Sequence, residues 1–136
     1  MRILLVDDDM PSAEALTELL EGAGYGVVCA PNGREALARL REASYCVILL
    51  DIMMPVMNGY EFREAQLNDP KLATIPVVVI TADGRAREKA RQIGVDRYLL
   101  KPLSPPELLR TIAEVCPAPA DALSESEAVG AAKRPG

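Results

Sequence analysis

Short apolar runs alternate with amphipathic segments along the first 116 residues of the chain. Three of the runs are almost unbroken Val, Ile and Leu, which is typical of parallel strands covered on both faces. The segments between them carry apolar residues at helical spacing. The pattern predicts five strand–helix units and therefore an α/β fold with a doubly wound parallel sheet. The expected strands are 2–6 (RILLV), 26–30 (GVVCA), 46–50 (CVILL), 76–80 (PVVVI) and 95–100 (VDRYLL).

Capping residues mark the ends of the expected helices. Asn and Ser accept hydrogen bonds from the first free N–H groups of a helix, and glycine often ends one. Proline directly after a cap residue strengthens the prediction of a helix start, as in Ser104-Pro105. The expected N-caps are Asn32, Asn58 and Ser104, and the expected stops are Gly22, Gly24 and Gly94.

The composition changes at Pro117. Residues 117–136 (PAPADALSESEAVGAAKRPG) are rich in Pro, Ala, Ser and Glu and contain few large apolar residues. Such a segment is expected to be a disordered tail or linker. The sequence thus predicts one domain over residues 1–116, followed by a tail over residues 117–136.

The bulk composition narrows the class of protein. Of the 136 residues, 49% are hydrophobic and 26% are charged, as in a soluble globular protein. We find neither an apolar run long enough to span a membrane nor a signal peptide, so we expect a cytoplasmic protein that does not bind membranes. The net charge of −5 argues against direct binding of nucleic acid.

Cysteine and histidine usage limits the chemistry. The three cysteines are an odd number without CxxC spacing, so we expect free thiols rather than a disulfide framework or a zinc site. The chain has no histidine, which removes the commonest general base and most transition-metal sites. Any bound metal should therefore be a hard cation held by oxygen atoms.

Polar residues stand at the ends of four of the five expected strands. The first ends in Asp7-Asp8-Asp9, the third in Asp51, the fourth in Thr81 and the fifth in Lys101. Each alone has an ordinary explanation, because Asp often caps a helix, Thr often lies in a turn and Lys is usually at the surface. Together they indicate a site, because ligands of open α/β sheets bind beyond the carboxyl ends of the strands.

The residue types in this set suit phosphoryl chemistry. Carboxylates that converge repel one another, and Mg²⁺ is the cation that such oxygen atoms usually hold beside a phosphate. An aspartate can also act as the nucleophile and form an aspartyl-phosphate without a general base. The hydroxyl of Thr81 and the ammonium of Lys101 can both contact phosphoryl oxygens.

From Arg2 to about Val115 the sequence closely resembles the CheY-like receiver domains of two-component response regulators. The resemblance implies a flavodoxin-like (βα)5 fold with a five-stranded parallel sheet of order 2-1-3-4-5 and helices on both faces. It implies a signalling domain that catalyses only its own phosphorylation and autodephosphorylation. The matching motifs are ILLVDDD, LLDIMMPVMNGYE, VVVITAD and GVDRYLLKPL.

The resemblance also assigns roles around the third strand. Asp51 is implied as the phosphoacceptor, which receives its phosphoryl group from the phosphohistidine of a histidine kinase or phosphotransfer protein. Asp8 is implied to bind Mg²⁺ directly and Asp7 mostly through water, with Asp51 and the backbone carbonyl of Met53 as further ligands. Mn²⁺ is an alternative metal.

The remaining implied roles concern switching. Thr81 resembles the switch hydroxyl, Tyr98 the switch aromatic and Lys101 the phosphate-contacting lysine. Ala82 is small and fits beside the phosphoryl group. The bond between Lys101 and Pro102 resembles the cis peptide of the family.

The expected partners follow from the same resemblance. The face built by the fourth helix, fifth strand and fifth helix is implied to control a downstream protein or an output domain, and homodimerisation on phosphorylation is a further option. The sequence fits both a stand-alone receiver and part of a longer regulator. The basic residues Arg85, Arg87, Lys89 and Arg91 are either a solvated helix face or a surface that binds a partner.

Three other functions have to be weighed. Phosphatases with an aspartyl nucleophile generally resemble DxDxT, whereas Asp51 is followed by Ile52 and Met53. A nucleotide- or flavin-binding module needs a glycine-rich loop where this chain has three aspartates. An interaction domain without chemistry has no need of the complete set of strand-end residues.

Overall fold

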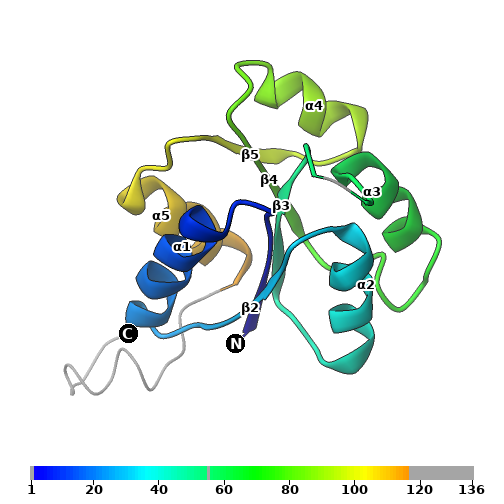
Figure 1. The fold of residues 1–136 in the computed structure, drawn as a ribbon, viewed down its shortest axis with the longest axis horizontal. Coiled ribbons are helices and arrows are strands. Elements are labelled where there is room, and N and C mark those ends of the chain that lie inside the picture. The colour runs from blue at the N-terminus through cyan, green and yellow to red at the C-terminus, as the bar shows by residue number, and fades with distance from the viewer. Residues whose placement is uncertain (1, 55, 117–136) are drawn as a thin grey trace.

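The computed structural model describes residues 2–54 and 56–116. Within them five strands alternate with five helices, and the strands form one parallel sheet of order β2-β1-β3-β4-β5 (Figure 1). The predicted fold class and strand order are therefore confirmed. The elements are β1 (Arg2–Val6), α1 (Met10–Gly22), β2 (Gly26–Ala30), α2 (Gly33–Glu42), β3 (Val47–Asp51), α3 (Gly59–Leu67), β4 (Val77–Thr81), α4 (Ala86–Gln92), β5 (Arg97–Leu100) and α5 (Pro105–Val115).

Both faces of the sheet are covered, which explains the unbroken apolar strands. Alternate residues of a strand point to opposite faces. In β3, for example, Val47 and Leu49 pack in the core beneath α1 and α5, whereas Ile48 and Leu50 pack in the core beneath α2, α3 and α4. Figure 1 shows α1 and α5 on one side of the sheet and α2 and α3 on the other.

The helix ends follow the predicted caps in part. Asn32 and Asn58 each accept a hydrogen bond from the backbone N–H three residues later, and Asn58 forms a full capping box with Glu61. Ser104 occupies the N-cap position of α5, but its side chain makes no capping bond. Gly94 lies just beyond α4 with a φ of 72°, a conformation that glycine adopts without strain.

Two strands lie one residue later than the pattern predicts. Asp51 is the last residue of β3, paired with Ile80, and Thr81 is the last residue of β4, paired with Leu100. Backbone pairing continues to these polar residues because their neighbours in the sheet are still regular strands. Both side chains are thereby fixed on the sheet rather than on a loop.

The prediction of three free thiols is wrong for two of them. Cys46 and Cys116 form a disulfide, and Cys29 is free. The fold brings the two Cα atoms to 5.5 Å from each other although 70 residues separate them. Sequence spacing could not reveal the pair because α5 returns to the start of β3 only in the folded chain.

Within residues 2–54 and 56–116, no helix is both long and apolar enough to cross a membrane. The predicted tail, 117–136, lies outside the described residues.

Candidate functional site

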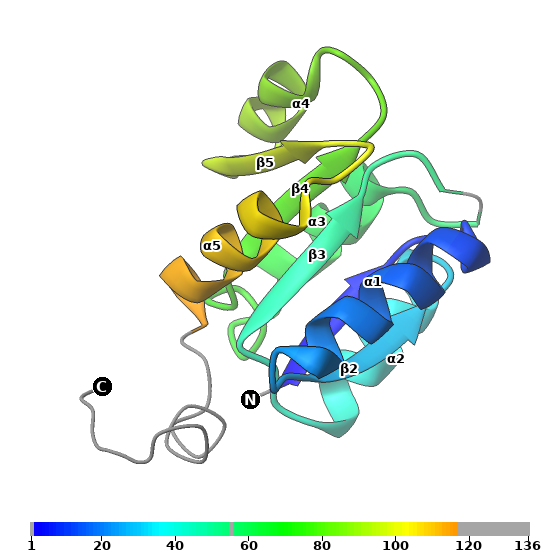
Figure 2. The same cartoon turned by 90° about the vertical axis from the view of Figure 1, so that its left-hand side faces the viewer.

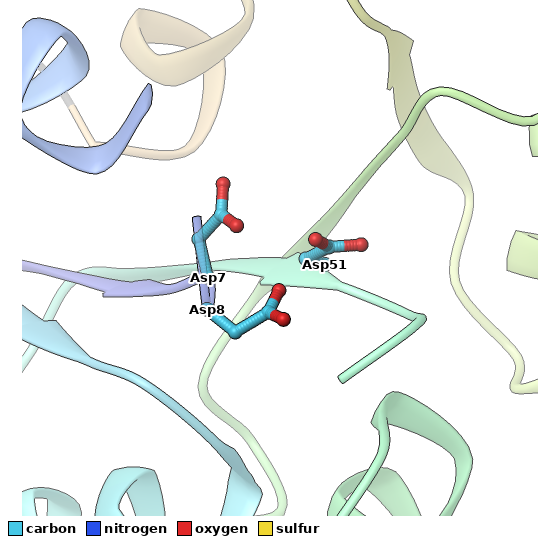
Figure 3. A group of neighbouring side chains, drawn as sticks. All are labelled: Asp7, Asp8 and Asp51. Atoms are coloured by element: carbon cyan, nitrogen blue, oxygen red, sulfur yellow. The ribbon is translucent and has the colours of Figure 1, made fainter. Parts of the chain in front are cut away.

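Three carboxylates converge at the carboxyl end of the sheet. Asp7 and Asp8 follow β1, and Asp51 ends the neighbouring strand β3. One carboxylate oxygen from each lies within 4.8 Å of the others. Figure 3 shows Asp8 and Asp51 directed into the same space beside Asp7.

Local backbone geometry fixes the two buried members of this group. The side chain of Asp7 accepts a hydrogen bond of 3.0 Å from the backbone N–H of Asp9, and Asp51 accepts one of 3.2 Å from that of Met53. Asp7 is 1% exposed and Asp51 is 7% exposed, whereas Asp8 is open to solvent. The site therefore has a rigid floor and one accessible carboxylate.

Lys101 supplies a positive charge to the cluster. Its ammonium donates a hydrogen bond of 2.8 Å to Asp7 and lies 3.6 Å from a carboxylate oxygen of Asp51. The backbone N–H of Lys101 donates to the carbonyl of Thr81 at 2.8 Å, which anchors the lysine beside β4. The peptide bond from Lys101 to Pro102 is cis.

Burial and nearby charges together shift the pKa values of Asp51 and Lys101. The pKa of Asp51 is raised from 3.8 to about 6, mainly by burial and further by the charge of Asp7, against the lowering effects of Lys101 and of the hydrogen bond from Met53. Burial alone lowers the pKa of Lys101, but its hydrogen bond to Asp7 and the two nearby carboxylates raise it above its ordinary value. The lysine thus stays charged and partly neutralises the carboxylates.

The donor set fits a magnesium ion. Three carboxylates with oxygen atoms within 4.8 Å are hard ligands at a spacing that one ion can bridge. A single ammonium leaves an excess of negative charge at this point of the surface. The exposure of Asp8 provides access for a hydrated cation.

The loop after Asp51 is held close to the sheet. The backbone N–H of Gly59 donates to the carbonyl of Ile52 at 2.8 Å, and that of Gly33 donates to the carbonyl of Met57 at 2.9 Å. A Cβ atom on Gly59 would lie only 2.8 Å from the Cα of Ile52. Glycine at this position therefore allows α3 to begin directly against the end of β3.

Thr81 lies on the other side of Asp51, at the end of the neighbouring strand β4. Its side chain is 2% exposed, and its hydroxyl oxygen accepts a hydrogen bond of 3.1 Å from the backbone N–H of Asp83. Ala82 follows at the surface. The carboxyl ends of β1, β3, β4 and β5 thus bring together the acids, the hydroxyl and the lysine that the sequence placed there.

Tyr98 does not join this group. It lies on β5 opposite Val79 and is 40% exposed. With Arg87, Arg91 and Asp96 it lines a recess between α4 and β5. The structure thus places the aromatic ring on the outer surface, two strands away from Asp51.

The sequence did not predict the internal contacts of the basic helix α4. Lys89 and Arg85 each lie 3.6 Å from the carboxylate of Asp83, and Lys89 also lies 3.5 Å from the hydroxyl of Tyr60 on α3. The pKa of Asp83 is lowered, mainly by the hydrogen bond from the backbone N–H of Arg85 and further by the side chain of Arg85. Among the described residues Arg87 and Arg91 form no ion pair. Of the four basic residues only Lys89 is largely buried, whereas Arg85, Arg87 and Arg91 are exposed to solvent.

Most of the chain is similar to one known protein family. The model of the response regulator receiver domain matches residues 3–113. A CpxR homologue of Haemophilus influenzae, described as a transcriptional regulatory protein, is 41% identical over 82% of this chain and 48% of its own length. The chain thus spans about half the length of that relative.

Solved structures give the same similarity. The chemotaxis protein CheY4 of Vibrio cholerae matches with a TM-score of 0.77 and 34% identity, over 84% of this chain and 97% of that one. The receiver domain of the sensor histidine kinase PA1611 of Pseudomonas aeruginosa matches with a TM-score of 0.77 and 28% identity, over 84% of this chain and 95% of its own. The latter structure has a magnesium ion coordinated in its active-site cleft.

Proposed function

The chain belongs to the response regulator receiver domains of two-component systems, and from this membership we propose that Asp51 accepts a phosphoryl group from a phosphohistidine. The observation that supports it most directly is the meeting of Asp7, Asp8 and Asp51 within 4.8 Å, beside the ammonium of Lys101. A buried carboxylate at the rigid end of a strand, with a cation beside it, is suited to nucleophilic attack.

In the proposed reaction a carboxylate oxygen of Asp51 attacks phosphorus. A P–O bond forms, the P–N bond of the phosphohistidine breaks, and the released imidazole takes up a proton from solvent. The donor is a histidine kinase or a phosphotransfer protein. Lys101, which is 3.6 Å from Asp51, contacts the transferred phosphoryl oxygens and balances their charge.

Asp7, Asp8, Asp51 and the backbone carbonyl of Met53 would hold a magnesium ion, for which Mn²⁺ is an alternative. When bound, the ion neutralises the carboxylates and the phosphoryl oxygens so that both can approach. Met53 is 62% exposed and therefore lies at the surface, two residues after Asp51. The magnesium in the cleft of the PA1611 receiver supports this assignment.

Phosphorylation then alters the surface of α4, β5 and α5. The hydroxyl of Thr81 moves toward the phosphoryl group, for which the small side chain of Ala82 leaves room, and the exposed ring of Tyr98 turns inward. Because Thr81 and Lys101 lie on adjacent strand ends, one phosphoryl group can engage both. The switch is thus driven from Asp51 and read on the outer face of β5.

The altered face is where a downstream protein, an output domain or a second copy of the chain binds. Its described surface includes Tyr98 and Leu100, which are 40% and 48% exposed, and the unpaired cations Arg87 and Arg91. Large exposed apolar side chains beside arginines are common in protein interfaces. The receiver acts in this way as a signalling domain of the cytoplasm and catalyses only its own phosphorylation and dephosphorylation.

The direct test is chemical phosphorylation. The protein is incubated with Mg²⁺ and acetyl phosphate, and the intact mass is measured. We expect one added phosphoryl group that is stable in acid, is lost in base and does not form in the presence of EDTA. The variant Asp51→Asn should give no adduct.

Asp69→Asn is the matched control, because Asp69 lies in the turn after α3, outside the carboxylate cluster. It should be labelled like the parent chain. An adduct that persists in Asp51→Asn, or steady hydrolysis of many phosphate esters, contradicts the proposed function.

A further inference from the structure

Two cysteines lie at the opposite end of the sheet from the carboxylate site. Cys46 directly precedes β3, whose far end is Asp51, and Cys116 is the C-cap of α5. Their Cα atoms are 5.5 Å apart, a separation at which a disulfide closes without movement of the backbone. Figure 2 shows the end of α5, in orange, beside the start of β3.

The two sulfur atoms differ in access. Cys116 is fully buried in the core beneath α1 and α5, whereas Cys46 is partly exposed. A dissolved reagent therefore reaches Cys46 first, and Cys116 can react only with the sulfur of its neighbour. This is the arrangement of an attacking and a resolving thiol.

The last turn of α5 packs in the core through Ile112 and Cys116, and the disulfide adds a covalent tie from this turn to the start of β3. The hydroxyl of Tyr25 donates a buried hydrogen bond of 2.7 Å to the backbone carbonyl of Cys116. Arg97 of β5 forms an ion pair of 3.2 Å with Glu114, but both side chains are largely exposed, so this pair adds little. Loss of the disulfide should therefore loosen this turn.

We propose that Cys46 and Cys116 form a reversible redox site that locks the C-terminal turn of α5 onto the start of β3 when oxidised and releases it when reduced. The oxidant is a low-molecular-weight disulfide of the glutathione type. The thiolate of Cys46 attacks one sulfur of the oxidant, a mixed disulfide forms, and the first thiol leaves with a proton. The thiol of Cys116 loses its proton and attacks the Sγ of Cys46, and the second thiol leaves. Two protein thiols and one external disulfide thus become one protein disulfide and two external thiols.

The site is independent of phosphoryl transfer. Cys46 and Asp51 stand at opposite ends of the same strand, and neither cysteine contacts a residue of the carboxylate cluster. The disulfide joins two residues that are 70 positions apart in the sequence, so it restricts the unfolded chain. Oxidation should therefore raise the melting temperature by about 10 °C without change at the carboxylates.

The test uses the full chain with Cys29→Ser, so that only the pair carries thiols. The native protein is equilibrated in glutathione buffers from fully reduced to fully oxidised, quenched in acid, unfolded and alkylated for mass analysis. We expect two alkylated thiols at the reduced end, none at the oxidised end and a reversible transition between them. The melting temperature should rise with oxidation, and amide exchange should slow in the last turn of α5.

Two controls make the outcome decisive. Adding Cys46→Ser should abolish the transition and leave both the melting temperature and exchange in α5 insensitive to the buffer. A pair that never oxidises, a disulfide that native protein keeps in excess reduced glutathione, or oxidation without an effect on α5 overturns the proposal. Labelling by acetyl phosphate is measured in both redox forms: loss in both forms bears on Asp51 alone, whereas loss in only one form contradicts the independence of the two sites.

Discussion

The ammonium of Lys101 lies 2.8 Å from a carboxylate oxygen of Asp7, across 94 residues of sequence. The two residues belong to the ends of β5 and β1, which are separated in the sheet by β3 and β4. The lysine thus reaches over Asp51 to the far carboxylate. In this position it competes with a metal ion for Asp7 and also stands ready to meet a phosphoryl group.

Lys101→Met separates these two effects. Without the ammonium, we expect the affinity for Mg²⁺ to rise about tenfold, equivalent to ~1.4 kcal/mol, because a cation no longer repels the ion. Phosphorylation by acetyl phosphate at saturating Mg²⁺ should become about tenfold slower, because the phosphoryl oxygens lose a positive partner. Calorimetric titration and the time course of the mass adduct measure the two quantities.

Lys71→Met is the control, since Lys71 is exposed in the turn after α3 and lines none of this site. It should change neither quantity. If Lys101→Met binds Mg²⁺ less tightly than the parent chain, the lysine supports the metal site instead of opposing it.

Asp8→Asn tests the metal site through stability. In the parent chain Mg²⁺ at 10 to 100 times its dissociation constant should raise the free energy of unfolding by about 1–3 kcal/mol. In the variant this gain should be almost lost. With EDTA the variant should be as stable as the parent or more stable by up to ~1 kcal/mol, because one of three repelling charges is gone.

Urea unfolding with and without Mg²⁺ provides the measurement, and Asp9→Asn is the neighbouring control. Asp9 is exposed, makes no side-chain capping bond and is not one of the three clustered acids. A full response to Mg²⁺ in Asp8→Asn excludes a direct role of its carboxylate.

Much of this site is predictable because parallel strands end at one edge of the sheet. The strands at 2–6 and 26–30 have the bounds that their apolar patterns indicate. Asp51 and Thr81 become neighbours through the strand order, which the resemblance to receiver domains implies. Spacing alone does not give it.

Contacts that depend on packing were not predictable. Gln66 lies in the buried face of α3, where its amide donates to the carbonyls of Leu72 and Ile75 at 2.9 and 3.1 Å. In sequence it resembles any polar surface residue. The same holds for Cys46 and Cys116, because nothing local to either indicates the other.

Gly59→Ala tests how tightly the loop after Asp51 is fitted. The added Cβ would lie 2.8 Å from the Cα of Ile52 and 3.2 Å from the carbonyl oxygen of Asp51, so backbone atoms must move. We expect a loss of about 1–3 kcal/mol in the free energy of unfolding and slower phosphorylation.

The control is Gly22→Ala at the end of α1, where no atom lies within 4 Å of the new Cβ. It should be neutral or stabilising by up to ~1 kcal/mol, whereas equal losses in both variants contradict a specific fit at Gly59.

Tyr25 links the alkaline stability of the fold to the end of α5. Burial raises the pKa of its phenol above the ordinary value of 10.0, so the unfolded chain releases this proton first. The contribution to stability is complete below pH 10 and is lost as the pH rises through the higher folded pKa.

Tyr25→Phe should lose about 1–2 kcal/mol in the free energy of unfolding at pH 7, because the buried carbonyl of Cys116 loses its donor. Above pH 10 its stability should decline less steeply than that of the parent chain. Urea unfolding between pH 7 and 11 measures both effects, and Tyr45→Phe is the control for a half-buried phenol. An equally steep alkaline decline in Tyr25→Phe and in the parent chain rules out the link between Tyr25 and alkaline stability.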